Sequence, residues 1–205
     1  MSRGRFITVE GPEGSGKSTH SRLLCLHLKK KGFKVLHTRE PGGTKIGEAI
    51  RKVLLDKKNK GMSGACELLL FLAARAQIVE EIIRPALARG YIVVCDRFHD
   101  ATVAYQGYGA GLDLKLIDSM GRLATGGLRP DLTVLLDVET EVGLKRAGIK
   151  DRMEIKPVRF HKKVRNGYLE IAKKEPRRIK IIRTTGAPVA AIQDKIRRAV
   201  SHVVQ

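Results

Sequence analysis

The stretch of sequence that decides the fold is residues 6–19, which read FITVEGPEGSGKST. The first four residues form an apolar, largely β-branched run that predicts a buried strand. Gly11 to Ser18 follow, and their spacing fits the phosphate-loop pattern G-x-x-x-x-G-K-[ST]. The backbone N–H groups of such a loop surround phosphate oxygens, and the N-terminus of the next helix adds partial positive charge. The stretch therefore predicts a strand, a phosphate-binding loop and a helix in succession.

The side chains of this loop predict nucleotide chemistry. Lys17 supplies a full positive charge to the β- and γ-phosphates, and the Ser18 hydroxyl is a ligand for Mg²⁺. Glu13 is unexpected because a carboxylate beside phosphates is repelled, so it either faces solvent, which the loop alone favours, or binds a hydroxyl of a second substrate. The predicted ATP-binding residues are Gly11, Pro12, Glu13, Gly14, Ser15, Gly16, Lys17, Ser18 and Thr19.

Four more strand-like runs follow along the chain, at residues 35–38, 91–95, 132–136 and, more weakly, 179–182. Stretches with helical apolar spacing separate them. This alternation is typical of a parallel sheet that is covered on both faces and binds ligands at the carboxyl ends of its strands. We therefore predict a three-layer α/β phosphate-loop NTPase fold, with a five-stranded parallel sheet flanked by helices.

Length and irregularity suggest how the chain is organised. The 205 residues are enough for one domain with a sizeable core, so we expect residues 1–205 to form a single domain. The least regular segment is 147–157, which is basic and poor in large apolar residues. We interpret it as a short lid over the site.

The charge balance is strongly positive, with 40 Lys and Arg against 21 Asp and Glu and a formal net charge of +19. Such a charge attracts anions, whether nucleic acid, acidic lipid or small phosphorylated molecules. Aromatic residues make up only 4% of the chain and tryptophan is absent, which weakens the interpretation as a single-strand-binding protein. A solvated basic surface that keeps the protein soluble explains the charge equally well.

Cysteine usage and hydropathy indicate a soluble protein of the cytoplasm. Cys25, Cys66 and Cys95 form neither a paired disulfide framework nor a metal-binding cluster. They are typical of small apolar residues in a reducing compartment. No apolar run reaches the roughly 18 residues that a membrane helix requires.

Charged residues follow two more of the predicted strands. Arg39 ends the second, where its planar guanidinium suits a phosphate, although a surface pair with Glu40 would explain it too. Asp96 ends the third, at the position from which a carboxylate holds nucleotide-bound Mg²⁺ in phosphate-loop enzymes. Arg97 follows on the ligand side, unless the two form a pair that caps a helix.

At these residues the sequence resembles the thymidylate kinase family, whose members transfer the γ-phosphoryl group of ATP to dTMP. The resemblance runs from Glu10 to Glu154, and its elements occur in the family's order. They are Glu10-Gly11, Arg39-Glu40-Pro41-Gly42-Gly43-Thr44, Phe71-Leu72-Ala73-Ala74-Arg75, Asp96-Arg97-Phe98, Ala104-Tyr105-Gln106-Gly107, Pro130-Asp131-Leu132 and Asp151-Arg152-Met153-Glu154.

The resemblance implies a role in dTMP binding for several of these residues. Phe71 would stack on thymine and Arg75, one helical turn later, would hydrogen-bond the base, although core packing is the ordinary explanation for Phe71. The family implies that Arg39 and Arg97 bind the dTMP phosphate. It also implies that Glu13 accepts from the sugar 3′-hydroxyl and does not face solvent. Tyr105 would lie where a ribose 2′-hydroxyl would collide with it, and Gln106 would lie beside the base.

Catalysis in this family needs no strong general base, because the acceptor phosphate oxygen is already anionic. Lys17, Mg²⁺ and arginines such as Arg97 must instead offset the repulsion between two polyanions. Some relatives carry an arginine at the position of Gly14, so this sequence resembles the subtype whose catalytic arginine lies in the lid. The candidates are Arg146, Lys150 and Arg152; the Asp151-Arg152-x-Glu154 context favours Arg152, and Lys150 fits a solvated lid surface.

The sequence departs from the family pattern at two places. Ala101 stands where the family usually has a serine that contacts substrate or positions Arg97, and Thr102 is the neighbouring hydroxyl that can replace it. Residues 183–185 read Arg-Thr-Thr where relatives often have an acidic residue. The second departure concerns the adenine side of the site.

The resemblance implies ATP- and Mg²⁺-dependent phosphorylation of dTMP to dTDP in dTTP synthesis. It also implies a homodimer that pairs through helices, with no nucleic acid or membrane as partner. Two alternatives stay open, a kinase of another nucleoside monophosphate and a basic nucleic-acid-binding protein whose phosphate loop serves regulation.

Overall fold

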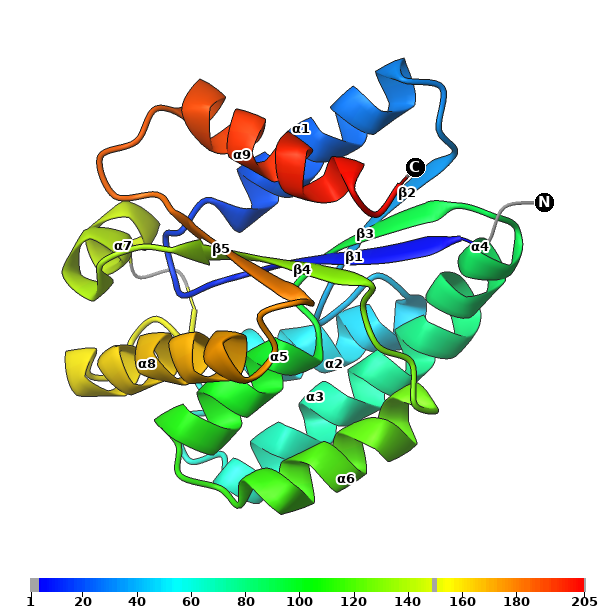
Figure 1. Ribbon diagram of the computed structural model, residues 1–205. Coiled ribbons are helices and arrows are strands. Elements are labelled where there is room, and N and C mark those ends of the chain that lie inside the picture. Colours follow the sequence, from blue (N-terminus) through cyan, green and yellow to red (C-terminus); the bar gives the residue numbers. More distant parts are fainter. Residues whose placement is uncertain (1–3, 149–150, 205) are drawn as a thin grey trace.

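The computed structural model describes residues 4–148 and 151–204 and contains one parallel sheet (Figure 1). The strand order is β2-β3-β1-β4-β5. Each strand overlaps one of the five runs that predicted it. The strands are β1 (Arg5–Glu10), β2 (Val35–Arg39), β3 (Ile92–Asp96), β4 (Leu132–Asp137) and β5 (Ile179–Arg183).

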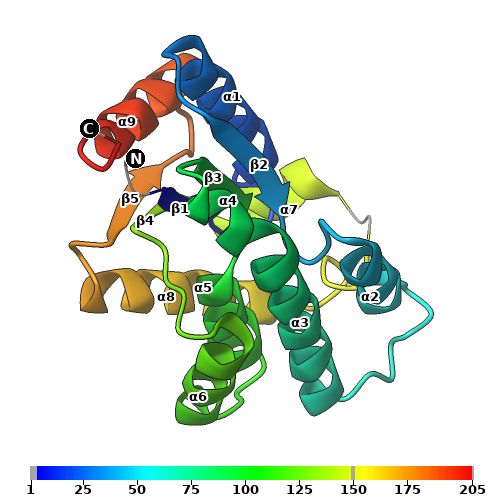
Figure 2. The ribbon, with the colours of Figure 1, turned by 90° about the vertical axis from the view of Figure 1, so that its right-hand side faces the viewer.

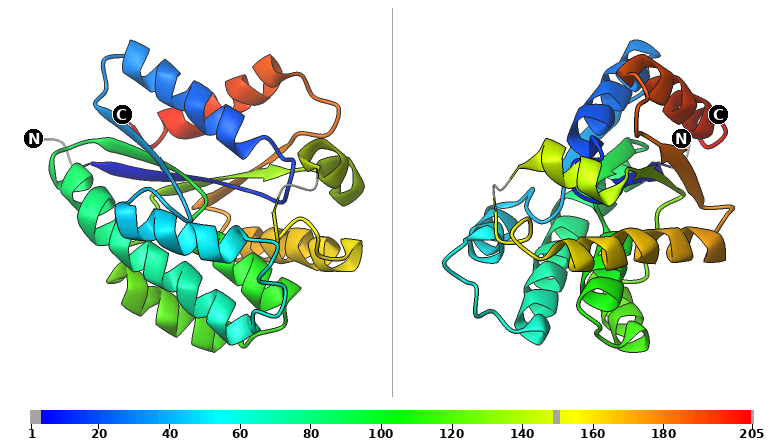
Figure 3. Two further views of the ribbon diagram at one scale, coloured as in Figure 1. Left: turned by 180° about the vertical axis from the view of Figure 1, so that it is seen from behind. Right: turned by 90° about the vertical axis from the view of Figure 1, so that its left-hand side faces the viewer.

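Helices cover both faces of the sheet, which confirms the predicted three layers. The helices are α1 (Lys17–Lys30), α2 (Lys45–Leu55), α3 (Gly64–Ile78), α4 (Arg84–Ala88), α5 (His99–Thr102), α6 (Leu114–Thr125), α7 (Thr140–Ala147), α8 (Val158–Lys174) and α9 (Val189–Ser201), with π-helical turns η1 (Val79–Ile83) and η2 (Val103–Gly109). One face carries α1 and α9, whereas α2, α3, α5, α6 and α8 lie beyond the other (Figure 2). Helix α7 lies at the carboxyl edge of the sheet (Figure 3).

The core follows from the alternation of side chains along β1. Ile7 and Val9 pack in the cluster shared with α1 and α9, whereas Phe6 packs on the opposite side with η1 and α4. Because helices cover both faces of the sheet, every residue of β1 after Arg5 is buried, whichever face its side chain points to. This is why the central strands appear in the sequence as near-continuous apolar runs.

The phosphate loop is pressed against α7 at the carboxyl edge. A Cβ atom at Gly14, whose φ is +66°, would clash with the carbonyl oxygen of Gly143, and one at Gly143 would clash with the carbonyl oxygen of Glu13. The two glycines therefore let the loop and the helix approach backbone to backbone. No side chain fits at position 14 in this arrangement, so an arginine that serves catalysis must come from another segment.

Residues 151–157 of the predicted lid precede α8 and lie against α2 and α3 (Figure 3). The Arg152 backbone N–H donates to the carbonyl oxygen of Leu55 at 3.1 Å. Ala147 is the last residue of α7. Lys150 lies outside the described residues. In the part of the chain that the structure describes, no helix combines the length and the hydropathy needed to cross a bilayer.

Candidate active site

A cavity of about 610 Å³ opens at the carboxyl edge of the sheet. It is lined by residues of the phosphate loop, the ends of β2 and β3, and helices α2, α3 and α7, as well as η2 and the lid. The predicted site residues on its wall are Glu13, Gly14, Gly16, Lys17, Ser18, Thr19, Arg39, Phe71, Arg75, Asp96, Arg97, Tyr105, Gln106 and Arg146. Residues far apart in the sequence therefore meet in one cavity.

The phosphate loop has the backbone that its glycines allow. Gly11, Gly14 and Gly16 all have positive φ values, of 147°, 66° and 90°. The Lys17 ammonium donates to the carbonyl oxygen of Pro12 at 2.8 Å and lies 3.4 Å from Ser15 Oγ. Burial lowers the pKa of Lys17 to about 8, and the positive charge of Arg97 contributes to the shift.

Ser18 and Asp96 lie together, as the sequence predicts for residues that share a metal ion. The Ser18 hydroxyl donates to Asp96 Oδ2 at 2.5 Å. Mg²⁺ prefers oxygen ligands and usually takes one or two carboxylates together with substrate phosphates and water. A hydroxyl and a carboxylate beside the phosphate loop fit that donor set.

Arg97 has an unusual backbone conformation. Its φ of +70° is unusual for a residue with a side chain. The backbone is held on both sides, because the Arg97 N–H donates to the Val9 carbonyl oxygen and the Phe98 N–H donates to Glu10 Oε1. Such a conformation persists where the surroundings over-determine it, as they do at functional sites.

The Arg97 guanidinium binds four groups at the cavity. Nη2 donates to both carboxylate oxygens of Glu13 at 3.1 Å and to the Tyr105 hydroxyl at 3.2 Å. Nη1 donates to the Gly11 carbonyl oxygen at 3.1 Å and to the Tyr168 hydroxyl at 3.3 Å. The guanidinium therefore joins the phosphate loop to the end of β3.

Glu13 is not directed to solvent, which the loop alone had favoured. Its side chain is only 15% exposed and also accepts a hydrogen bond from the Tyr105 hydroxyl at 2.8 Å. Burial alone would raise the pKa of Glu13, but the charges of Arg97 and Lys17 and the Tyr105 hydrogen bond lower it to about 2. Glu13 is therefore an ionised acceptor on the cavity wall.

Phe71 and Arg75 both lie on the wall of the cavity, one turn apart on α3. Phe71 is half-buried and is absent from the clusters of fully buried core residues. Arg75 is fully buried and donates to Glu40 Oε2, Thr102 Oγ1 and the Phe98 carbonyl oxygen at 2.8–2.9 Å. The Thr102 hydroxyl, next to Ala101 in the sequence, thus positions Arg75.

Arg39 reaches the cavity from the end of β2, but it does not pair with Glu40. It donates instead to the carboxylate of Glu48 on α2 at 2.9 and 3.1 Å. Glu40 turns into the protein, where it pairs with Arg75. Neighbours in the sequence therefore point in different directions, and only Arg39 remains partly exposed.

Tyr105 and Gln106 both turn inward although they are consecutive. They lie in η2, where Ala110 N–H bonds the Tyr105 carbonyl oxygen and Leu112 N–H bonds that of Gln106. Single π-helical turns of this kind are frequent at functional sites. Gln106 Nε2 donates to Glu67 Oε1 at 2.8 Å.

The structure places the two lid-side arginines differently. Arg152, which the sequence favours as the catalytic arginine, does not line the cavity: Nη1 pairs with Glu67 at 2.6 Å and Nε donates to the Leu54 carbonyl oxygen at 2.7 Å. Arg146, at the end of α7, does line the cavity, and no described residue forms an ion pair with it. In this structure a buried carboxylate holds Arg152 away from the phosphate loop, so its catalytic role stays a prediction from the sequence.

Sequence reasoning missed several residues that shape the site. Arg51 of α2 lines the cavity and donates to the Pro41 carbonyl oxygen at 2.8 Å. Tyr168 of α8 donates to Glu10 at 2.9 Å and accepts from Arg97. A basic residue on the helix that follows Arg39 was an available signal for Arg51. Nothing in the sequence pattern indicates that Tyr168 reaches the carboxyl edge of the sheet.

Residues 183–185 do not reach the cavity. The Thr184 hydroxyl donates to the Asp137 carbonyl oxygen, and the Thr185 hydroxyl accepts from the Glu139 N–H. These bonds tie the end of β5 to the start of α7. The effect of this departure on adenine contacts stays a prediction.

Comparison with known proteins agrees with this geometry. The model of the thymidylate kinase family matches residues 9–196. The chain belongs to the thymidylate kinase family. A thymidylate kinase of Geotalea daltonii is 57% identical over 189 residues, which cover 87% of this chain and 88% of the relative. One of Symbiobacterium thermophilum is 47% identical over 201 residues, covering 97% and 94%.

A solved structure supports the same conclusion for the fold. The crystal structure of thymidylate kinase from Ehrlichia chaffeensis superposes with a TM-score of 0.80 at 36% identity and covers 98% of this chain and 99% of that one. The family resemblance, the phosphate-loop NTPase fold and the predicted activity are confirmed. The chain is a kinase that phosphorylates dTMP to dTDP with ATP as phosphoryl donor.

We expect ATP binding to be coupled to proton uptake at Lys17. Its pKa of about 8 leaves the side chain mostly neutral near pH 9, and the bound phosphates favour the ammonium form. Calorimetry of ATP binding near pH 9, in buffers of different ionisation enthalpy, should therefore show uptake, which disappears near pH 6 because Lys17 is then already protonated.

The variant Lys17→Arg is the control, since a guanidinium stays charged at both pH values. It should bind ATP near pH 9 without this uptake. Equal uptake by the two proteins would assign the proton to another group.

Proposed function

We propose that the cavity holds ATP on the phosphate loop and dTMP between α3 and Arg97, so that the two phosphates meet beside Lys17. The observation that carries this proposal is the meeting of the phosphate loop with Phe71, Arg75 and Arg97 on one wall. The loop supplies backbone donors from Gly11 to Ser18, and Lys17 reaches the β- and γ-phosphates. Ser18 and Asp96 would hold Mg²⁺, which when bound neutralises phosphate charge.

On the acceptor side, Arg97 and Arg39 would bind the dTMP phosphate, and Arg51 adds a third guanidinium from α2. Glu13 would accept from the sugar 3′-hydroxyl, since its carboxylate is ionised and held in place by Arg97. Tyr105 packs beside it, where its hydroxyl binds both Glu13 and Arg97 and leaves little room for a ribose 2′-hydroxyl. Phe71 would stack on the base.

The chemistry requires alignment and charge neutralisation. The attacking dTMP oxygen already carries negative charge, so no side chain need remove a proton. Lys17 and Arg97 are both at the point where the two phosphates would meet, and their positive charge opposes the repulsion. We assign the remaining catalytic arginine to Arg146, because it faces the cavity from the phosphate-loop side.

We also propose that the protein is a homodimer. Helix α3 exposes Leu69, and the neighbouring α6 exposes Leu116 and Leu123, the latter at 85%. Leu116 and Leu123 are seven residues apart, which is two helical turns, so they share one face. Large apolar side chains gathered on adjacent helices are typical of a subunit interface.

Two further assignments from the sequence stay proposals. We place the protein in the cytoplasm, supported by the free thiols Cys25, Cys66 and Cys95. We also take residues 1–205 as a single domain with a lid at 147–157, since the core clusters on both faces share the same sheet.

The proposed function predicts that purified protein, with ATP and Mg²⁺, converts dTMP to dTDP. A panel of dTMP, dUMP, dCMP, dGMP and UMP should show preference for a thymine or uracil base on a deoxyribose. Nucleotide products separated by chromatography give the rates. A clear preference for a purine would contradict the roles of Phe71 and Arg75.

We expect Arg146 to act in catalysis and Arg152 to stabilise the fold. Arg146→Ala should lower kcat by about 10²-fold with little change in dTMP affinity, because a cation aimed at developing charge acts mainly in the transition state. Arg152→Ala should instead lower the melting temperature, since removing one partner of a buried ion pair costs about 3–5 kcal/mol.

Kinetics and thermal unfolding of both variants check this division. Lys145→Ala is the matched control for Arg146, since Lys145 is the preceding, exposed basic residue of α7 and is not part of the cavity wall. The assignment fails if Arg146→Ala keeps its turnover while Arg152→Ala loses it at a temperature where the protein is folded.

The dimer predicts that Leu123→Asp shifts the protein toward monomer. A buried, unpaired carboxylate in an apolar interface is strongly unfavourable. Light scattering coupled to gel filtration measures the mass. Leu26→Asp, on exposed apolar surface of α1, is the control and should leave the mass unchanged. A wild-type monomer at all concentrations would contradict the proposal.

A further inference from the structure

Behind the base end of the cavity lies a buried carboxylate, Glu67 of α3. Its side chain is 3% exposed and meets three donors. Gln106 Nε2 lies 2.8 Å from Oε1, Arg152 Nη1 lies 2.6 Å from Oε2, and Lys156 Nζ lies 3.3 Å from both oxygens. One side of Glu67 therefore faces lid cations, and the other faces the amide of a residue on the cavity wall.

The charge of Glu67 fixes the amide of Gln106. Burial alone would raise the pKa of Glu67, but the Gln106 hydrogen bond and the two cations lower it, so the group is ionised at neutral pH. An ionised carboxylate only accepts hydrogen bonds. The atom of Gln106 that faces it must therefore be the NH₂ group.

The carbonyl oxygen of the Gln106 amide can bind a ligand in the cavity. Gln106 lines the cavity wall, and among the described residues no group donates to its Oε1. The atom is also not sealed in the protein without a partner, in contrast to Oε1 of Gln193. Gln106 thus presents a carbonyl oxygen, an acceptor, to whatever occupies the base end.

Arg75 presents the complementary group on the same wall. Its Nε and Nη2 are engaged by Glu40 and the Phe98 carbonyl oxygen, and one Nη1 proton is engaged by Thr102. A second Nη1 proton remains for a ligand. The wall therefore offers one donor and one acceptor.

We propose that Glu67 is the residue that sets base specificity, by holding the Gln106 amide with its carbonyl oxygen toward the base. This rests on the proposed function, in which the base lies between Phe71, Arg75 and Gln106. Thymine presents an acceptor at its C4 oxygen and a donor at N3–H, which match Arg75 and Gln106. Cytosine presents an amino donor and an unprotonated N3 in the same places, so both contacts become mismatched.

The variant Glu67→Gln tests this proposal because the lid cations dictate the orientation of the new amide. Arg152 and Lys156 can only donate, so the carbonyl oxygen of that amide must face them and its NH₂ group must face Gln106. Gln106 then turns its own oxygen toward position 67 and its NH₂ group toward the cavity. Glu67→Gln should therefore lose the preference for thymine over cytosine.

The readout is the ratio of kcat/KM for dTMP and dCMP, together with the ratio of their dissociation constants from calorimetry. We expect Glu67→Gln to lower both ratios by roughly 10- to 100-fold, since mismatched donors and acceptors in a buried site discriminate strongly. The swapped variant Glu67→Gln with Gln106→Glu should recover most of the preference. In it the carboxylate at position 106 accepts from the amide at position 67 with one oxygen and offers the other to N3–H.

The swap separates orientation from a merely structural role. If Glu67 only supported the fold, Glu67→Gln would weaken dTMP and dCMP alike and the swap would restore nothing. Glu80→Gln is the control, because it removes only the exposed pair between Glu80 of η1 and Arg84 of α4. An unchanged ratio in Glu67→Gln, from an active wild-type enzyme, overturns the proposal.

Failure of the proposed function gives a different result, because the wild type itself would then show no turnover of dTMP. If Glu67→Gln does not fold, the swapped variant remains a test, since it keeps the net charge of the cluster formed by positions 67, 106, 152 and 156. A preference of the folded swapped variant for dCMP would then overturn the proposal.

Discussion

The site depends on the ion pair between Arg97 and Glu13, which joins the end of β3 to the phosphate loop. The pair would have little value at a solvated surface, but here both side chains are mostly buried, with 18% of Arg97 and 15% of Glu13 exposed, and they share Tyr105 as a third partner. Arg97 adopts a left-handed backbone conformation to reach Glu13, and hydrogen bonds to Val9 and Glu10 hold that backbone. The position of Arg97 relative to the phosphate loop therefore follows from β1 and β3 themselves, which are hydrogen-bonded neighbours in the sheet.

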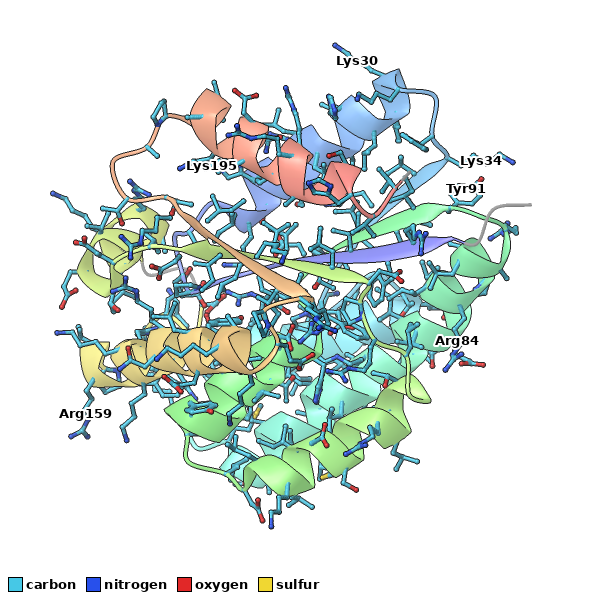
Figure 4. The ribbon with its side chains drawn as sticks, viewed as in Figure 1. Lys30, Lys34, Arg84, Tyr91, Arg159 and Lys195 are labelled. Atoms are coloured by element: carbon cyan, nitrogen blue, oxygen red, sulfur yellow. The ribbon has the colours of Figure 1, made fainter. Side chains whose placement is uncertain are left out.

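The net charge of +19 is distributed in a way that composition could not reveal. Several arginines of the site are balanced by carboxylates: Arg39 by Glu48, Arg75 by Glu40, and Arg97 by Glu13. Many other cations extend into solvent, and Lys30, Lys34, Arg159 and Lys195 illustrate this around the surface (Figure 4). Most of the excess therefore belongs to the solvated basic surface, whereas these three arginines of the site each have a carboxylate partner.

The sequence predicts elements well where local pattern and tertiary packing agree. All five strands and the phosphate loop follow from apolar runs and glycine spacing, because strands of a sheet that is covered on both faces appear in the sequence as near-continuous apolar runs. The inward turn of both Tyr105 and Gln106 does not follow, since a π-helical turn breaks the helical period without a sequence signal. The burial of Arg152 could not be predicted either, because its partner Glu67 lies on a helix distant in sequence and the motif gives no direction for the side chain.

The attachment of the lid limits which arginine can act on the phosphates. Moving Arg152 to the phosphate loop would break its pair with Glu67 and its bond to Leu54, and leaving a buried carboxylate with fewer partners costs several kcal/mol. Glu67 also holds Gln106, so the same movement would disturb the base end of the cavity. Arg146 avoids both costs, because it already faces the cavity from α7, whose Gly143 is packed on the phosphate loop. In the site that we propose, a lid anchored by Arg152 and a catalytic cation on α7 would allow base recognition and phosphate neutralisation to proceed without competing for one side chain.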